Sequence, residues 1–395
     1  MTRLASHARR KAPSGIDRVE LAYARAALST GRCAGAVIAE RIGGRWLGPG
    51  DAGRLLERAL AFWREYETHA APGGAANAGE LADTPAFALF RQRSDFAIRA
   101  AQGGGAAGAV YLRASHDQLD RLNWLARWPR ISKIFFIHDI LPVQWPEYFV
   151  AGEAARHKRK LSAAKRFGDA LLVSSAAAAQ DLRMSGLIAD KPIHILPIGV
   201  ESVFRRGVRQ EPAPAAAPYF VMCGTLEPRK NHLLVLNLWR QLALTRPDPP
   251  RLVIVGRRGW ENEAIVDMLE RCDALRPYVS ELSELPTPAL ANLLRGASAL
   301  LAPSFAEGYG IPVLEALAVG APVIASDIAS HREIAGPYAT FLDPLDGLAW
   351  RAAVIAAAKR PIASDSPLLA DFEPPRWEPH IARLFEIIDA LPEKR

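Results

Sequence analysis

Short apolar runs alternate with amphipathic stretches along most of the chain, and this alternation restricts the fold more than any other feature. Runs such as "YFVMCG" (219–224) and "RLVIVG" (251–256) are separated by stretches with helical spacing. Continuous runs of Val, Ile and Leu are typical of strands buried on both faces, and helices between them indicate parallel sheets. The pattern therefore predicts an α/β protein.

The same pattern occurs in both halves of the chain. The expected strands span 34–40, 108–115, 133–140, 169–175, 219–224, 251–256, 298–304 and 322–326. The expected helices span 17–30, 51–68, 152–167, 231–245, 261–275, 287–296 and 312–319. We therefore expect two Rossmann-like parallel-sheet domains facing a cleft, with the ligand beyond the carboxyl ends of the strands.

A Pro/Ala-rich stretch, "GVRQEPAPAAAP" (207–218), has no helical or strand periodicity and is interpreted as a linker. It separates an N-terminal domain, 1–206, from a C-terminal domain, 219–375. The final segment, 376–395, has the apolar spacing of an amphipathic helix. Such a helix either caps the second domain or crosses back to the first, and we favour the crossing helix.

Positive charge is concentrated in the first half. Residues 1–204 hold 28 Lys and Arg against 19 Asp and Glu, whereas residues 205–395 hold 21 against 23. An excess of this kind suggests nucleic acid, a membrane surface or a phosphorylated substrate as partner. The stretch 154–169 places several of the charges on one expected helix, for which a solvated face is the simpler explanation. They are Arg156, His157, Lys158, Arg159, Lys160, Lys165 and Arg166.

Apolar length and cysteine content bear on the compartment. No apolar run reaches the roughly 18–20 residues that span a bilayer, and the N-terminal stretch lacks the apolar core of a signal peptide. The three cysteines, Cys33, Cys223 and Cys272, are far apart and suggest neither a disulfide framework nor a zinc site. We expect a cytoplasmic protein.

The stretch "LLAPSFAEGYGIPVLEALAVGAPVIAS" (300–326) has the order strand, glycine turn, helix. Glycines let the backbone approach a diphosphate closely, and amides at a helix N-terminus favour an anion. We expect the amides of Gly310, Ile311, Val313 and Leu314 to serve in this way. Glu315 by itself is explained by the helix dipole, but Glu307 lies on a loop where a carboxylate suits sugar hydroxyls.

Residues 307–326, "EGYGIPVLEALAVGAPVIAS", resemble the E-x7-E signature of the retaining family-4 glycosyltransferases, which have the GT-B fold. The stretch "VMCGTLEPRKN" (221–231) resembles a second segment of that family, in which a glycine ends a strand and an Arg-Lys pair follows. The resemblance implies a nucleotide diphosphate sugar as donor. The guanidinium and ammonium of such a pair suit a diphosphate leaving group.

The resemblance also implies roles for single residues. Glu315 would hold the ribose, Glu307 the hydroxyls of the transferred hexose, and Arg229 and Lys230 the diphosphate. Gly224 would end the strand before that pair. Along the sugar and diphosphate would lie Gly308, Tyr309, Gly310 and Ile311.

The N-terminal domain is implied to bind the acceptor. His138, in "IFFIHDILP" (134–142), matches a strand-ending His-Asp of the family and is our candidate at the reacting centre, with a satisfied core histidine as the alternative. Gly15 matches a glycine before the family's first helix and would lie near the diphosphate. The chain departs from the family here, because "MTRLASHARR" (1–10) contains no clear apolar first strand.

The sequence contains no D-x-D and no His/Cys cluster with metal-ligand spacing, so no metal and no cofactor are expected. The resemblance implies a retaining hexosyltransferase, with GDP-mannose as the favoured donor. The implied acceptor is a polyprenyl-diphosphate-linked oligosaccharide or growing surface polysaccharide, bound at the inner face of the membrane. The alternatives are a nucleotide-sugar epimerase or phosphorylase of the same architecture, and a nucleic-acid-binding protein that uses the basic half.

Overall fold

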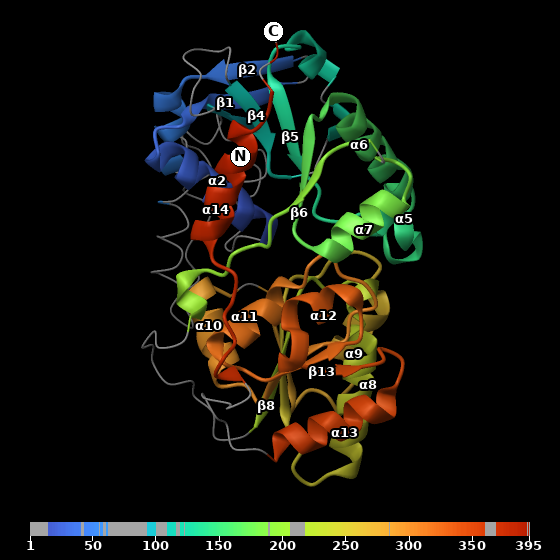
Figure 1. Ribbon diagram of the computed structural model, residues 1–395. Helices are drawn as coiled ribbons and strands as arrows, with labels where there is room; N and C mark the ends of the chain where they lie inside the picture. Colours follow the sequence, from blue (N-terminus) through green and yellow to red (C-terminus); the bar gives the residue numbers. More distant parts are fainter. Residues whose placement is uncertain are drawn as a thin grey trace, which may run out of the picture. The chain divides into compact units, whose positions relative to one another are not determined.

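The computed structural model forms two compact units, and neither is a continuous stretch of chain (Figure 1). Unit 1 combines Met1–Ile140, Ala155–Gly199 and Pro375–Arg395, and unit 2 combines Leu141–Ala154 and Val200–Pro374. The structure describes residues 15–40, 43–54, 56–57, 61, 93–99, 109–115, 119–121, 123–188, 190–205, 218–283, 285–359, 369–392 and 394. The expected linker up to residue 217 and most of the expected helix 51–68 lie outside them.

Unit 1 is built on a seven-stranded sheet of order β2-β1-β3-β4-β5-β6-β7. The strands are β1 (Cys33–Glu40), β2 (Gly43–Leu47), β3 (Arg93–Arg99), β4 (Ala109–Arg113), β5 (Ser132–Phe136), β6 (Ala170–Val173) and β7 (Ile193–Ile195). Strands β4 to β7 pair in parallel, which confirms the α/β prediction. Strands β1, β2 and β3 pair antiparallel, which the sequence pattern did not predict.

The antiparallel pairing of β1 and β2 follows from their separation. Only two residues lie between Glu40 and Gly43, whereas a parallel connection needs a dozen or more residues. The apolar pattern of 34–40 predicts a strand but carries no information about the direction of its neighbour. The strand itself is therefore confirmed, and the parallel sheet expected in this half consists of β4 to β7, extended on one side by the antiparallel strands β3, β1 and β2.

In the described residues of unit 1, the main helices that accompany this sheet are α2 (Gly15–Ser29), α6 (Glu153–Phe167), α7 (Ala176–Met184) and α14 (Trp377–Asp389). Helix α7 begins with a cap, because the side chain of Ser175 accepts a hydrogen bond from the amide of Ala178. Strands β5 and β6 are buried along their whole length, as expected for the centre of a parallel sheet. No helix in the described parts of the chain is long and apolar enough to cross a membrane.

The final helix, α14, returns to unit 1 and lies beside α2 (Figure 1). His380 on α14 donates through Nδ1 to the carbonyl of Pro197 at 2.7 Å, so its neutral ring accepts at Nε2 the hydroxyl of Tyr23 at 2.8 Å. Arg32 forms an ion pair with Asp389 near the other end of the helix. These contacts confirm the prediction that the C-terminal helix crosses back.

Unit 2 contains a six-stranded parallel sheet of order β10-β9-β8-β11-β12-β13. The strands are β8 (Tyr219–Cys223), β9 (Arg251–Val255), β10 (Val279–Leu282), β11 (Ala299–Ala302), β12 (Val323–Ser326) and β13 (Thr340–Leu342). The chain winds outward from β8 to β10, returns to the other side of β8, and continues outward. The order therefore reverses between β8 and β11, which is where open α/β sheets bind ligands.

Two groups of helices cover this sheet (Figure 1). One group consists of α8 (His232–Thr245), α9 (Glu263–Arg271) and α13 (Gly347–Ala358), and the other of α10 (Thr287–Arg295), α11 (Ile311–Val319) and α12 (Ala329–Ala335). The core beneath the first group contains Trp239 and Trp350, both fully buried. Their indole N–H groups donate to the carbonyls of Pro250 and Asp343 at 2.8 and 2.9 Å, so these large side chains leave no indole donor unsatisfied.

A short segment from the first half of the sequence belongs to unit 2. It contains α5 (Leu141–Gln144) and a 3-10 turn at Pro146–Tyr148. The ring of Tyr148 stacks on Phe305 with centroids 5.5 Å apart and an interplanar angle of 7°, and its carbonyl accepts the indole N–H of Trp260 at 3.0 Å. Aromatic stacking and one part-buried hydrogen bond thus hold the segment on unit 2.

Tyr23→Phe should lower the stability of unit 1, because it leaves Nε2 of His380 buried without its donor. The expected loss in free energy of unfolding is about 1–3 kcal/mol, measured by urea denaturation with circular dichroism. Tyr338→Phe is the matched control, since its hydroxyl makes only an exposed 3.4 Å contact to the carbonyl of Asp371. Equal stability of Tyr23→Phe and the wild type would contradict the role given to this contact.

Candidate functional site

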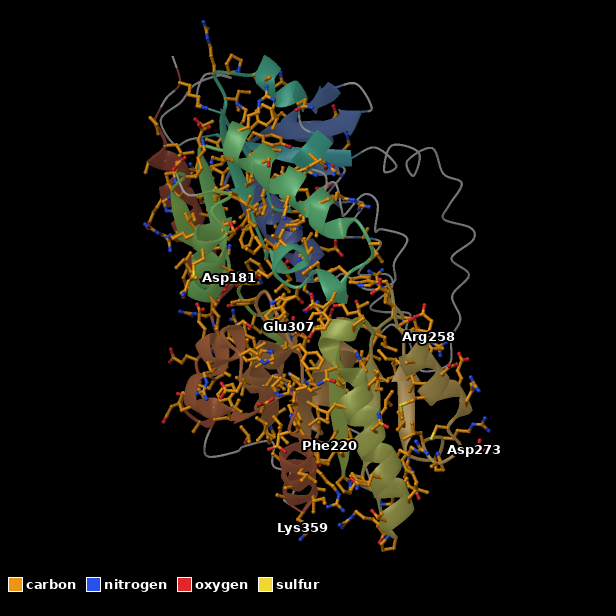
Figure 2. All side chains as sticks on the ribbon, turned by 90° about the vertical axis from the view of Figure 1, so that its right-hand side faces the viewer. Asp181, Phe220, Arg258, Asp273, Glu307 and Lys359 are labelled. Carbon is orange, nitrogen blue, oxygen red and sulfur yellow. The ribbon has the colours of Figure 1, made fainter. Side chains whose placement is uncertain are left out.

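The reversal of strand order in unit 2 brings together the residues that follow β8 and β11. After β8 come Gly224 and a 3-10 turn at Pro228–Lys230, and after β11 comes the loop that carries Ser304 and Glu307. A pocket opens here, and its lining includes Lys230, Ser304 and Glu307. Glu307 lies at the end of unit 2 opposite Lys359 (Figure 2). Residues 77 positions apart in sequence therefore share one site.

Glu307 is the centre of this site, and its carboxylate accepts hydrogen bonds from three side chains. The guanidinium of Arg229 donates to Oε2 at 2.7 Å, and the hydroxyl of Ser304 donates to Oε1 at 2.7 Å. The ammonium of Lys230 also donates to Oε1. The side chain of Glu307 is 8% exposed, against 10% for Lys230 and 17% for Arg229. One carboxylate thus pairs with two cations in a mostly buried setting.

The electrostatics keep Glu307 ionised. Burial alone raises the pKa of its carboxyl, but the electrostatic interactions with Lys230, Arg229 and His331 and the hydrogen bond from Lys230 act in the opposite direction. The result is a pKa well below the ordinary value of 4.5. A carboxylate held in this form is an acceptor only, which suits recognition of hydroxyl groups.

Arg229 and Lys230 are fixed by their surroundings. Arg229 also pairs with the buried carboxylate of Glu227 at 2.6 Å and donates to the carbonyl of Ala306 at 3.0 Å. A Cβ on Gly224 would lie only 3.1 Å from Cε and 3.3 Å from Nζ of Lys230, and Gly224 has a φ of +143°. Glycine at 224 therefore leaves the space through which the lysine reaches the pocket.

Helix α11 begins beside Glu307 at the predicted glycine turn. Gly310 precedes the helix in a left-handed conformation, with a φ of +99°. The amides of Val313 and Leu314 donate to the carbonyl of Gly310 at 3.0 and 3.3 Å. The expectation that these two amides serve an anion is therefore wrong, because the first turn of the helix uses them. Of the four predicted amides, those of Gly310 and Ile311 remain as candidates for binding an anion.

The other predicted residues of this segment lie on the same loop and helix. Tyr309 is buried and precedes α11, as does the half-buried Gly308. Glu315 is 4% exposed in the middle of α11. These placements agree with the expected order along the chain, and the ligand contacts assigned to the three residues stay predictions.

His138 and Gly15 belong to unit 1. His138 follows β5, is buried, donates through Nε2 to the carbonyl of Ala114 at 2.7 Å and stacks on Phe136. These are the contacts of the satisfied core histidine that the sequence left open, so its place at a reacting centre stays a prediction. Gly15 is the first residue of α2, and the segment 1–10 lies outside the described residues.

Three residues of the site escaped the sequence analysis: Ser304, Glu227 and His331. Ser304 and Glu227 lie inside the quoted motifs, at "APSFAE" and "TLEPRK". A serine or a glutamate in a loop after a strand is common without any ligand, so nothing in the sequence selected them. His331, on α12, lines the pocket and lies outside both motifs. Over the described parts of the chain, no three His, Cys, Asp or Glu side chains are grouped as metal ligands.

Comparison with known proteins gives a match over most of unit 2. Residues 205–361 match the sequence family "Glycosyl transferases group 1", and this range contains Arg229, Lys230, Glu307 and Glu315. The chain is 31% identical over 225 residues to the serotype-specific mannosyltransferase WbdA of Escherichia coli, over 52% of this chain and 27% of WbdA.

A second relative is the O-antigen chain mannosyltransferase RfbU of Salmonella typhimurium, 30% identical over 225 residues, which is 55% of this chain and 58% of RfbU. The chain therefore spans about a quarter of the length of WbdA and over half of RfbU. Among solved structures, Anabaena HepE in complex with UDP and glucose aligns with a TM-score of 0.59 at 16% identity, over 71% of this chain and 78% of HepE. The fold is that of the GT-B glycosyltransferases.

Glu307→Gln should destabilise unit 2, because it removes the counter-charge of the mostly buried Lys230 and leaves Arg229 with Glu227 alone. The expected loss at pH 7 is about 3 kcal/mol, measured by chemical denaturation. The pKa of Glu307 is lowered by folding, so its stabilisation is complete above pH 4.5 and decreases as the pH falls below that value. The difference between wild type and variant should therefore shrink below pH 4.5.

Asp327→Asn is the matched control for that measurement. Asp327 pairs with Arg332 in the same unit, but both side chains are exposed, at 42% and 58%. Solvent screening makes such pairs weak, so this variant should lose much less stability. A loss for Asp327→Asn equal to that for Glu307→Gln would contradict the importance assigned to the Glu307 site.

Proposed function

We propose that this chain, whose unit 2 matches the group 1 glycosyltransferases, is a retaining hexosyltransferase that uses a nucleotide diphosphate sugar as donor. The observation that carries the proposal is the Arg229–Glu307–Lys230 cluster at the pocket. It combines two fixed cations with one ionised carboxylate at the point where the strand order reverses. A sugar diphosphate presents the matching groups, which are anionic oxygens next to hydroxyls.

Binding of such a donor would exchange partners within the cluster. The diphosphate would take the guanidinium of Arg229 and the ammonium of Lys230, and sugar hydroxyls would donate to Glu307 in their place. Charge-assisted hydrogen bonds of this kind contribute about 1.5–3 kcal/mol each. As the glycosidic bond to the diphosphate breaks, negative charge grows on the leaving group, and the two cations stabilise it in the transition state. We therefore propose that the reaction needs no metal and no cofactor.

We further propose that the transferred sugar is mannose, from GDP-mannose, and that the acceptor is a lipid-linked oligosaccharide or polysaccharide. The support is the identity of about 30% to WbdA and RfbU, which are named as a mannosyltransferase and an O-antigen chain mannosyltransferase. Transfer with retention would leave the new bond in the configuration of the donor, with the leaving phosphate assisting deprotonation of the acceptor hydroxyl.

The donor is tested by a thermal-shift panel of GDP-, UDP-, dTDP- and ADP-sugars. We expect GDP-mannose to raise the melting temperature most, because a ligand that binds only the folded state stabilises it. Activity is then followed as transfer of labelled mannose to a polyprenyl-diphosphate-linked oligosaccharide, with nuclear magnetic resonance of the product to read its anomeric configuration.

Lys230→Ala and Glu307→Gln should each abolish transfer, since they remove a diphosphate ligand and the hydroxyl acceptor. Lys359→Ala is the control, an exposed lysine at the far end of unit 2 (Figure 2). Full activity in both site variants would refute the site assignment. Stabilisation by none of the four nucleotide-sugar series would refute the proposed donor class.

Helix α6 supports a place for the enzyme at the cytoplasmic face of the membrane, which we also propose. His157 and Lys160 are buried on this helix. Its exposed basic residues are Arg156, Lys158, Arg159, Lys165 and Arg166. Each cation near an anionic surface contributes about 1 kcal/mol.

Co-sedimentation with phosphatidylglycerol vesicles should therefore exceed that with phosphatidylcholine vesicles. It should fall in Lys158→Glu/Arg159→Glu. Arg276→Glu, in unit 2, is the control and should leave it unchanged. Equal binding to both vesicle types would contradict the membrane proposal.

A further inference from the structure

His331 is a buried histidine of the pocket to which neither quoted motif assigns a role. It lies on α12, one strand further along the sheet than Glu307, and is 1% exposed. Its imidazole lines the same pocket as Lys230, Ser304 and Glu307. The residue therefore shares a site with the charged cluster while coming from a separate part of the chain.

The hydrogen bonding of His331 determines which proton its ring carries. Nδ1 lies 3.0 Å from the carbonyl oxygen of Ser326, the last residue of β12. A carbonyl oxygen only accepts, so Nδ1 is the protonated nitrogen. The opposite nitrogen, Nε2, then carries a lone pair in the neutral ring and acts as an acceptor.

The neutral form is the one favoured in the fold. Burial lowers the pKa of His331, and the ammonium of Lys230 acts in the same direction. The carboxylate of Glu307 and the bond to Ser326 oppose this, but the pKa remains below 6.5. At neutral pH the ring therefore presents an acceptor at Nε2.

Gly310 brings the pocket side of the ring close to the start of α11. A Cβ on Gly310 would lie 3.2 Å from Cδ2 and 3.6 Å from Nε2 of His331. The ring edge that carries Nε2 is thus next to the backbone turn at which the amides of Gly310 and Ile311 are left for an anion. A ligand bound at this turn comes within reach of Nε2.

We propose that Nε2 of His331 accepts a hydrogen bond from a hydroxyl group of the donor's sugar, which makes His331 a sugar-recognition residue of the pocket. The proposal rests on the proposed function, since it requires a nucleotide diphosphate sugar in this site. A phosphate oxygen is excluded as the partner, because an ionised phosphate and the lone pair of Nε2 are both acceptors. Arg229 and Lys230 are the donors suited to the phosphate.

The chain allows a pair of variants that separate the two ring nitrogens. In His331→Asn, the side-chain amide can still donate to the carbonyl of Ser326 from near the position of Nδ1, but nothing replaces Nε2. In His331→Gln, the longer side chain restores a polar group near Nε2. Arg332→Gln is the matched control, because Arg332 is the next residue of α12 and is exposed at 58%.

The experiment measures binding of GDP-mannose and of GDP to each variant by isothermal titration calorimetry. Loss of one hydrogen bond should weaken GDP-mannose binding to His331→Asn by about fivefold to tenfold, with GDP binding unchanged. His331→Gln should recover part of the loss, and Arg332→Gln should bind both ligands as the wild type does. Monodeoxy analogues of GDP-mannose identify the hydroxyl concerned. The one analogue that lacks this hydroxyl should bind the wild type and His331→Asn with equal affinity.

The following results would contradict the proposed role of His331. An equal loss for GDP and GDP-mannose would overturn the inference, because His331 would then act on the phosphates or on the fold. Unchanged GDP-mannose binding in a folded His331→Asn, checked by its melting temperature, would also overturn it. If His331→Asn does not fold, His331→Gln is compared with His331→Leu. Recognition through Nε2 is overturned if both variants bind GDP normally and bind GDP-mannose equally weakly. Binding of no nucleotide by the wild type would refute the proposed function and this inference with it.

Discussion

The site depends on the ion pairs that the carboxylate of Glu307 makes with Arg229 and Lys230. These two cations lie at the start of α11, where the helix dipole already contributes a partial positive charge. Arg229 and Lys230 follow β8, and Glu307 follows β11. Without that carboxylate, Lys230 would be a mostly buried cation without a counter-charge, beside Arg229 and the N-terminus of α11, and only Arg229 would keep an ion pair, with Glu227. The ion pairs therefore make an otherwise unfavourable group of donors compatible with a folded unit and keep them available for an anion.

The sequence predicted much of this arrangement for reasons that the structure makes clear. In unit 2, each apolar run is separated from the next by a helix, so the parallel order follows from chain geometry and the motif residues fall at strand ends. In unit 1, β1 and β2 are too close in sequence for such a connection. The apolar pattern is the same for parallel and antiparallel neighbours, so their direction could not be read from it.

Two parts of the structure could not be predicted from local patterns at all. The stacking of Tyr148 on Phe305 joins residues 157 positions apart. The local sequence "PEYF" does not predict a contact with the other half of the sequence. His331 reaches the pocket because β12 lies next to β11 and because Gly310 has no side chain. A lone histidine after a strand has no distinctive spacing in the sequence. Its position at the pocket is therefore determined by tertiary contacts alone.

The division of the chain into interleaved segments has a consequence for the order in which the protein folds. Unit 1 needs α14, which is synthesised after both segments of unit 2, because His380 provides the buried acceptor for Tyr23. Domains generally fold as units during synthesis, with the N-terminal one first. Here the earlier segments of unit 1 wait for α14, so unit 2 is the first of the two units to have all of its segments.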